Sequence, residues 1–317
     1  MPNIITHGLF AKSVLNEMSN DALKQCITKY PREYIIGSNG PDFFFFYKFF
    51  QKKQEPIREI GSKVHASHVN DFFEMALHLI HDEKDQDLAS AMTSYLCGHL
   101  CHWALDSHAH PYIFYKTGNY SGINASMHHR FESMLDAMML MEIKKETIQT
   151  FKFYLLAKQS SISVKAISAI YLPILRDVFH IDLTEKHIQD ALNDWYRIQT
   201  YLYDPKKIKT KILKSYEKKV KKPYLFSGNV VPLEIDETFD VMNNQHAYWC
   251  YPTDNTKESH DSFMDIYKHA QEKAVMILNH LDNMEYVLEN IGNASYDTQE
   301  SERKEMKYFD LIYGDML

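Results

Sequence analysis

The segment 85–106 constrains the fold of this chain more than any other part of the sequence. It reads DQDLASAMTSYLCGHLCHWALD, has no Pro, and repeats large apolar residues at spacings of three and four. This periodicity predicts a long, largely buried helix. His99, His102 and Asp106 nevertheless share one face of that helix, because residues three and four apart lie above one another. A buried imidazole and carboxylate four residues apart form a bidentate platform that suits Zn²⁺.

The rest of the sequence predicts more helices and very little sheet. Only 10 Gly and 10 Pro occur among 317 residues, which disfavours turn-rich β folds. Helical periodicity or helix-start signals recur in five further segments: 62–82, 125–143, 161–178, 182–203 and 260–290. We expect Pro111 to end the central helix, and a long irregular loop near 223–258.

These features predict an all-α fold in which the helices form one multi-helix bundle. We expect a single helical domain over 1–292, with every candidate metal ligand within 1–136, and a polar C-terminal tail over 293–317.

Composition places the chain among soluble globular proteins, with 45% hydrophobic and 24% charged residues. The formal net charge of -7 argues against a stable nucleic-acid partner. The four Cys form no CxxC pattern and predict buried, reduced thiols. No segment has the length of a membrane span or the pattern of a signal peptide, so we expect a cytoplasmic protein.

A second metal-binding platform follows the first. His128 and Glu132 are four residues apart, and Asp136 lies one turn further on the same face of the predicted helix 125–143. If the two platforms converge, they form a multinuclear site. A purely structural zinc site is the opposing interpretation, but such sites are usually closed and rich in Cys, whereas these candidates are His, Asp and Glu.

Weaker candidates precede both platforms. His7 lies in a helix-forming segment, Asp42 follows the turn Gly37-Ser-Asn-Gly-Pro, and His65 and His68 lie in the next helical segment. Each has an ordinary alternative: a surface helix for His7, a helix N-cap for Asp42 and a solvated face for the two histidines.

Taken in order, these residues resemble the ligands of the zinc-dependent phospholipase C family, whose helical fold is similar to that of zinc-dependent single-strand nucleases. The motifs GHLCHWALDSHAHP and HHRFESMLD carry the resemblance, which covers about residues 1–136. It implies two or three zinc ions. The implied sets are Asp42, His65, His102 and Asp106 for one ion, His110, His128 and Glu132 for a second, and His7 with a bridging Asp106 for a third.

This chain departs from the family in two places. Characterised members use their mature amino terminus as a further ligand of the third metal, whereas here Met1 lies six residues before His7. His110 also follows Asp106 more closely than the matching histidine does, so His108 is a competing ligand. For His68, His99 and His129, hydrogen bonding to the ligands is the expected role.

The chemistry that fits such a site is hydrolysis of a phosphodiester, a phospholipid or a related small phosphodiester, by a metal-bound hydroxide. We assign Asp42 the role of orienting or deprotonating the water. Two alternatives stay open: a zinc-dependent single-strand nuclease, and a non-catalytic metal-binding protein that retains the cluster.

The segment Lys206–Lys222 is the other distinctive feature. It carries nine Lys and one Glu, with Ile208, Ile212, Tyr216 and Val220 at four-residue spacing. One interpretation is a transient contact of 206–222 with a membrane surface. The other, which we favour because the stripe is narrow and lacks Trp, is a solvated helix whose apolar stripe packs on the core.

Overall fold

The computed structural model describes residues 4–235, 239–301 and 304–313. Its α-helices (α), 3-10 helices (η) and strands (β) are, in chain order, α1 (Ile4–Glu17), α2 (Asp21–Lys29), α3 (Pro31–Gly37), η1 (Asp42–Phe46), η2 (Lys52–Gln54), α4 (Glu55–Ala66), α5 (Val69–Asp82), α6 (Gln86–Thr117), α7 (Ile123–Lys144), η3 (Phe153–Ala157), α8 (Ser161–Asp177), α9 (Glu185–Leu202), α10 (Ile208–Val220), η4 (Ser227–Asn229), β1 (Trp249–Tyr251), β2 (Asp254–Ser259), α11 (Phe263–Leu278) and α12 (Met284–Ile291).

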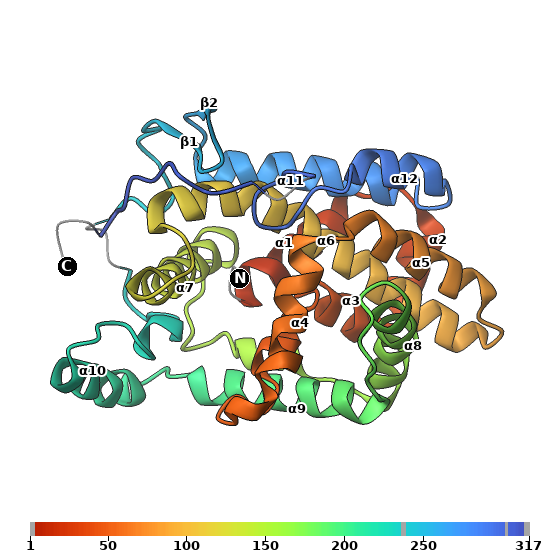
Figure 1. Cartoon of the computed structure of the whole chain (residues 1–317), viewed down its shortest axis with the longest axis horizontal. Helices are drawn as coiled ribbons and strands as arrows, with labels where there is room; N and C mark the ends of the chain where they lie inside the picture. The colour runs from red at the N-terminus through yellow and green to blue at the C-terminus, as the bar shows by residue number, and fades with distance from the viewer. Residues whose placement is uncertain (1–3, 236–238, 302–303, 314–317) are drawn as a thin grey trace.

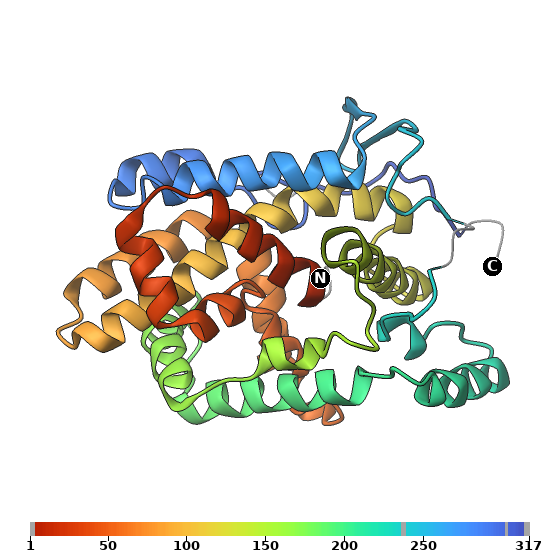
Figure 2. The same cartoon turned by 180° about the vertical axis from the view of Figure 1, so that it is seen from behind.

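This architecture confirms the predicted all-α bundle. Figure 1 shows α11 and α12 along one edge, α9 and α10 along the opposite edge, and α6 between them, and Figure 2 shows the same two edges from behind. The predicted irregular loop between α10 and α11 contains η4 and an antiparallel hairpin, β1–β2, which is the one sheet that the described residues form.

Helix α6 is the centre of the molecule. It packs against α1, α2, α3, α7, α8 and α11, and its residues are buried almost without interruption from Ala91 to Thr117. A helix that is apolar on all sides is the kind that a large core encloses. The polar side chains on α6 are therefore also removed from water.

The prediction that Pro111 ends the central helix is wrong. Helix α6 continues to Thr117, although Pro111 has no N–H to donate to the carbonyl oxygen four residues earlier. A Pro inside a helix costs about 3 kcal/mol. Beyond it, Tyr112 and Ile113 are fully buried, and such burial stabilises by about 1.5–3 kcal/mol for each large side chain. Packing after the Pro therefore offsets its local cost.

Two predicted helices are each divided in the structure. Segment 62–82 breaks at His68, whose backbone is left-handed with φ 58°, so α4 ends at Ala66 and α5 begins at Val69. Segment 260–290 breaks after Leu278. There the Asn279 side chain accepts hydrogen bonds from the backbone N–H groups of Ser19 and Asn20, which ties the chain to the α1–α2 turn. The predicted helices 125–143, 161–178 and 182–203 correspond closely to α7, α8 and α9.

The favoured interpretation of Lys206–Lys222 is wrong in one respect. The segment forms α10, but its apolar stripe does not pack on the core: Ile208, Ile212 and Tyr216 are each more than half exposed. Instead, the half-buried Leu213 and the buried Glu217 lie on the face that turns to the body. Glu217 accepts hydrogen bonds from residues 226 and 227, and these bonds set the rotation of the helix.

The C-terminal segment 293–313, apart from residues 302 and 303, packs on the helical body. The Trp103 indole N–H donates to the carbonyl oxygen of Ala294 at 2.9 Å, and the backbone N–H groups of Asp310 and Ile312 donate to Tyr115 and Lys116 at the end of α6. Figure 1 shows the segment running back from α12 alongside α11. It therefore reaches the middle of the bundle.

The cysteines are free, as predicted, with Cys97, Cys101 and Cys250 buried. Among the residues that the structure describes, no helix combines the length and apolar character needed to cross a bilayer.

Close approach of α3 to α6 depends on Gly98. A Cβ added at this position would lie 2.1 Å from the carbonyl oxygen of Tyr34, an impossible contact with backbone. We expect Gly98→Ala to lower the free energy of unfolding by about 1–3 kcal/mol in urea titrations, because two helices must move apart. The control is Gln86→Ala in the exposed first turn of α6, with an expected change within about 0.5 kcal/mol. Equal stability of the two variants would contradict the close packing.

Candidate metal centre

The eight residues predicted as metal ligands are all buried, and they converge from α1, η1, α4, α6 and α7. They form three groups, and within each group the nearest ligand atoms lie within 4.8 Å of one another: His7, His102 and Asp106; Asp42, His65 and His102; His110, His128 and Glu132. The first two groups share His102. Helix α6 contributes to every group, because His102, Asp106 and His110 follow one another at four-residue spacing.

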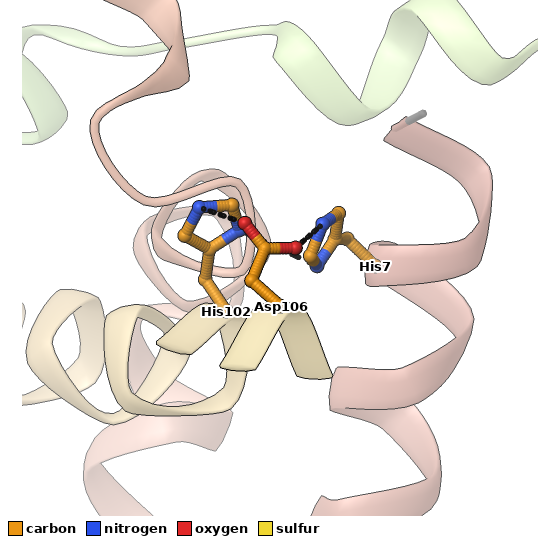
Figure 3. A group of neighbouring side chains, drawn as sticks. All are labelled: His7, His102 and Asp106. Atoms are coloured by element: carbon orange, nitrogen blue, oxygen red, sulfur yellow. Dashed lines mark hydrogen bonds and ion pairs between the residues drawn. The ribbon is translucent and has the colours of Figure 1, made fainter. Parts of the chain in front are cut away.

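Asp106 lies between the groups. Its Oδ1 is 3.1 Å from His7 Nε2, and its Oδ2 is 3.2 Å from His102 Nε2. Figure 3 shows His102 and Asp106 rising from α6 toward His7 on α1, with the two oxygens directed to different rings. Oδ2 is also 3.5 Å from His65 Nε2 and 3.9 Å from His110 Nδ1. One carboxylate therefore faces histidines from all three groups.

The group on η1, α4 and α6 is equally tight. Asp42 Oδ1 is 3.3 Å from His65 Nε2 and 3.7 Å from His102 Nε2, and the two Nε2 atoms are 3.2 Å apart. Separations of this size are those expected around one tetrahedral zinc, since bonds of 2.0–2.1 Å place neighbouring ligand atoms about 3.3 Å apart. His102 belongs to this group and to the one with His7.

The third group has only three members. Glu132 Oε1 lies 3.0 Å from His128 Nε2, one turn earlier on α7, and 3.7 Å from His110 Nε2 on α6. Two His and one Glu are the protein ligands of several catalytic zinc sites, which leave a fourth position for water or substrate.

Hydrogen bonds orient three of the histidine rings. The Nδ1–H of His65 donates to the Gly61 carbonyl at 2.7 Å, and that of His110 donates to the Tyr296 carbonyl at 2.9 Å. His128 Nδ1 is 3.1 Å from Thr117 Oγ1, whose own proton goes to the Ile113 carbonyl, so this Nδ1 must also be a donor. Each ring is thereby fixed in the tautomer that presents a lone pair on Nε2.

Burial and neighbouring charges together shift the pKa values of these groups. It lowers the pKa of His128 to about 4 and that of His102 well below the usual value, so both imidazoles are neutral at pH 7. Burial acts in the opposite direction on Asp106, but the surrounding His102, His110 and His7 hold its pKa well below the usual range. Burial also acts against the charged forms of His65 and His110, but the adjacent carboxylates prevail: Asp106 and Asp42 raise the pKa of His65 to about 10, and Asp106 raises that of His110.

Several of these atoms lack the hydrogen bonds that buried polar groups normally make. Within the described part of the chain, Asp42 Oδ1, both Asp106 oxygens, and Nε2 of His7 and His110 have no hydrogen-bond partner. Unsatisfied buried polar atoms cost about 1–3 kcal/mol each, and more when charged. Five such atoms aimed at one another fit divalent cations, and the nitrogen and oxygen donors without thiolates suit zinc.

His99 and Asp136, which were predicted to lie beside the ligands, hold the surrounding structure in place and belong to none of the three groups. His99 is fully buried one turn before His102, and its Nε2 is 2.8 Å from the Tyr296 hydroxyl. Asp136 accepts hydrogen bonds from the backbone N–H groups of Ile5 and Thr6 and from the Thr6 hydroxyl, so its carboxylate caps α1 just before His7. It connects the helix of Glu132 to the helix of His7.

The structure places two other candidates elsewhere. His68 is half exposed and pairs with Asp71. His108 lines a cavity on the other side of α6, together with Trp249 and His269. Its Nδ1 forms a hydrogen bond with the Ala104 carbonyl. These two histidines therefore have no place in the three groups, and His110, two residues further on α6, occupies the position between Asp106 and Glu132. Residue 1, the other departure from the family pattern, lies outside the described residues.

Two residues near the ligands, Tyr296 and Asp297, were not predicted from the sequence. The fully buried Tyr296 ring packs 4.7 Å from the His65 ring, and its backbone N–H donates to the His65 carbonyl. Asp297 Oδ1 is 3.7 Å from His110 Nδ1, with over a third of its side chain exposed. Neither residue has a spacing relation to the ligand motifs, since a turn after α12 brings both to the site.

Gly40 allows the close approach of η1 to α6. Its φ is +48°, and a Cβ there would lie 2.1 Å from the ring of His102. A residue with a side chain could not keep both this backbone conformation and the position of His102.

Comparison with known families finds that the model described as "Zinc dependent phospholipase C" matches residues 6–176. This range is more than half of the chain and contains all eight candidate ligands, but neither α10 nor Tyr296. No curated protein and no solved structure matches the chain.

His102 and His108 provide a matched test of the metal centre. We expect His102→Ala to reduce zinc per chain, measured by elemental analysis after dialysis, because two of the three groups lose a nitrogen. The loss of affinity should exceed the 10–100-fold typical for losing an outer hydrogen bond. His108→Ala, on the same helix, should retain the zinc content of the parent protein. A full zinc complement in His102→Ala would contradict the grouping.

Tyr296 tests the support from the C-terminal segment. Tyr296→Phe should destabilise the protein by about 1–3 kcal/mol, because His99 Nε2 loses its 2.8 Å partner inside the core. Zinc affinity should fall by about tenfold. Tyr308→Phe, a partly exposed position in the same segment, serves as the control. Urea titration measures the stability of both variants, and competition with a chelator measures their zinc affinity. Identical behaviour of the two variants would show that the segment only covers the site.

Proposed function

The chain belongs to the zinc-dependent phospholipase C family, and on that premise we propose that it hydrolyses a phosphodiester bond in a phospholipid or a related small phosphodiester. We propose His7, Asp42, His65, His102, Asp106, His110, His128 and Glu132 as the ligands of two or three zinc ions. The observation that carries the proposal is the position of Asp106, whose oxygens face ligand groups on both sides within a set of buried nitrogen and oxygen donors.

When bound, zinc ions lower the pKa of water toward 7 and accept phosphoryl oxygens as Lewis acids. The protein's part is to hold its donors in place. His65, His110 and His128 are fixed by hydrogen bonds to Gly61, Tyr296 and Thr117, and three of the donors lie on one helix that is packed on all sides. Such a rigid shell keeps reacting groups aligned without reorganisation during the reaction.

Asp42 is our candidate for the residue that orients or deprotonates water. Burial raises its pKa above the usual value, which makes the carboxylate a better proton acceptor. It extends from the start of η1, and its Oδ1 is directed at the site.

We propose that substrate reaches the site from the side where two partly exposed side chains border it. Over a third of the Asp297 side chain is exposed, and Tyr120, which is half exposed, packs its ring edge against His128. On this proposal, substrate phosphate meets the His110, His128 and Glu132 group between these two side chains. A closed, four-coordinate structural zinc would not leave this approach. The free thiols belong to none of the three groups.

The test is a substrate screen with zinc-loaded protein, using a chromogenic phosphodiester, phosphatidylcholine vesicles and single-stranded DNA. We expect release of the phosphorylated headgroup from phosphatidylcholine. Asp42→Asn should lower kcat by about 10²–10⁴-fold, the usual contribution of a general base, and Glu132→Ala should lower both zinc content and turnover. His108→Ala should have the activity of the parent protein.

Each other outcome has a definite meaning. Cleavage of DNA with no release of headgroup would identify a nuclease. A fully metallated protein without turnover on all three substrates would identify a metal-binding protein that has lost catalysis. Unchanged kcat in Asp42→Asn would remove this residue from the chemistry.

A further inference from the structure

Helix α10 presents an apolar stripe to solvent. Ile208, Ile212, Tyr216 and Val220 follow one another at four-residue spacing and are 58%, 65%, 51% and 36% exposed. The exposed Phe226 continues the stripe, with its ring 6.3 Å from that of Tyr216. Figures 1 and 2 both show α10 at the end of α9, projecting beyond the bundle. Contiguous exposed apolar surface of this kind marks an interaction site more often than chance exposure.

The orientation of α10 is fixed by hydrogen bonds on its other face. Asp204 accepts from the backbone N–H groups of Ile208 and Thr210 and from the Thr210 hydroxyl, which anchors the first turn. At the other end, the buried Glu217 accepts from Phe226 N–H and from both the N–H and hydroxyl of Ser227. Because both ends are held, the stripe faces outward as part of the folded structure.

Positive charge surrounds the stripe. The segment Lys206–Lys222 contains nine Lys, whereas the chain as a whole has a formal net charge of -7. Glu217, the single acidic residue of the segment, is buried and committed to three hydrogen bonds, so it does not offset the lysines at the surface. Lys211, Lys214 and Lys218 are all exposed.

Exposed aromatic side chains continue along the edge formed by α9. Tyr201, in the last turn of α9, is 73% exposed. Phe50, which is 89% exposed, belongs to a turn that is held against α9 by the hydrogen bond from Lys48 N–H to Asp194 Oδ2. This edge therefore offers apolar groups beyond α10 itself.

We propose that α10 docks the protein on the surface of an anionic phospholipid membrane. The helix lies flat, with its apolar stripe in the boundary between headgroups and acyl chains and its lysines among the anionic headgroups. A helix with one apolar face and a lysine-rich polar face binds membranes in this way. The binding stands on α10 alone, whereas its benefit, holding the enzyme beside its lipid substrate, rests on the proposed function.

The stripe distinguishes a membrane from the other polyanion that lysines attract. Nucleic-acid binding draws on positive charge, base stacking and hydrogen bonding, and exposed Ile208 and Ile212 would add nothing to it. A bilayer uses both properties at once, since burial of apolar side chains and attraction of lysines act together at its surface.

The experiment measures co-sedimentation of the full-length, zinc-loaded protein with vesicles of phosphatidylcholine, with and without phosphatidylserine. We expect binding to the anionic vesicles that weakens as salt is raised, because each lysine near the surface contributes about fivefold. Ile208→Ser with Ile212→Ser, and separately Lys211→Glu with Lys218→Glu, should each weaken binding by at least about tenfold.

Matched controls come from other surfaces of the molecule. Leu155→Ser changes an apolar residue on η3 that is 49% exposed. Lys158→Glu with Lys165→Glu reverses two exposed charges, the first just after η3 and the second on α8. These should bind as the parent protein does. The α10 variants should also keep the parent's thermal midpoint, since the altered side chains face solvent.

Four results would overturn the proposal: equal binding by the parent and both α10 variants, no binding to anionic vesicles, equal loss in the controls, or binding of single-stranded DNA in place of vesicles. Hydrolysis of a soluble chromogenic phosphodiester separates this proposal from the function. Vesicle binding without turnover would support the docking proposal and contradict the proposed function. Turnover without vesicle binding would support the proposed function and contradict the docking proposal.

Discussion

The burial of Asp106 on a helix that is enclosed on all sides is the constraint on which the rest of the structure depends. A carboxylate without hydrogen bonds in a protein core is among the most unfavourable groups that a fold can contain. Here it is surrounded by imidazoles from α1, α4 and α6, and its oxygens are directed at different rings. Much of the bundle can be understood as the arrangement that brings those imidazoles to it and holds them.

A layer of hydrogen bonds behind the ligands maintains this arrangement, and it is built from distant segments. Asp136 on α7 caps α1 and so sets the position of His7. The C-terminal segment contributes the Tyr296 carbonyl, which orients His110, and the Tyr296 hydroxyl, which meets His99. Three parts of the chain, more than a hundred residues apart, thus contribute to one rigid shell. The site therefore requires the whole fold, including residues beyond the part that matches the family.

The two tasks that we propose lie in different parts of the molecule. The candidate ligands lie within residues 6–176, where the family resemblance lies, while α10, which we propose meets the membrane, lies outside that range. A phosphodiesterase site of the proposed kind would by itself act on any ester that reached it. A docking helix selects by location, because it raises the local concentration of those substrates that form a surface.

The sequence by itself determined the helical class and two ligand pairs of the candidate site, because both depend on spacing along the chain. His7, Asp42 and His65 joined the candidate site through the family resemblance and not through spacing. His102 with Asp106 and His128 with Glu132 share helix faces wherever their helices pack. It could not determine that α6 passes through Pro111, since the burial of Tyr112 and Ile113 offsets the local cost. Nor could the sequence decide whether His108 or His110 faces the other ligands, because the direction of a side chain on a helix identifies its neighbours only when the positions of the surrounding helices are known. Tyr296 and the outward rotation of α10 were decided by tertiary contacts alone: hydrogen bonds to His99 and to Glu217 join residues that no periodicity relates.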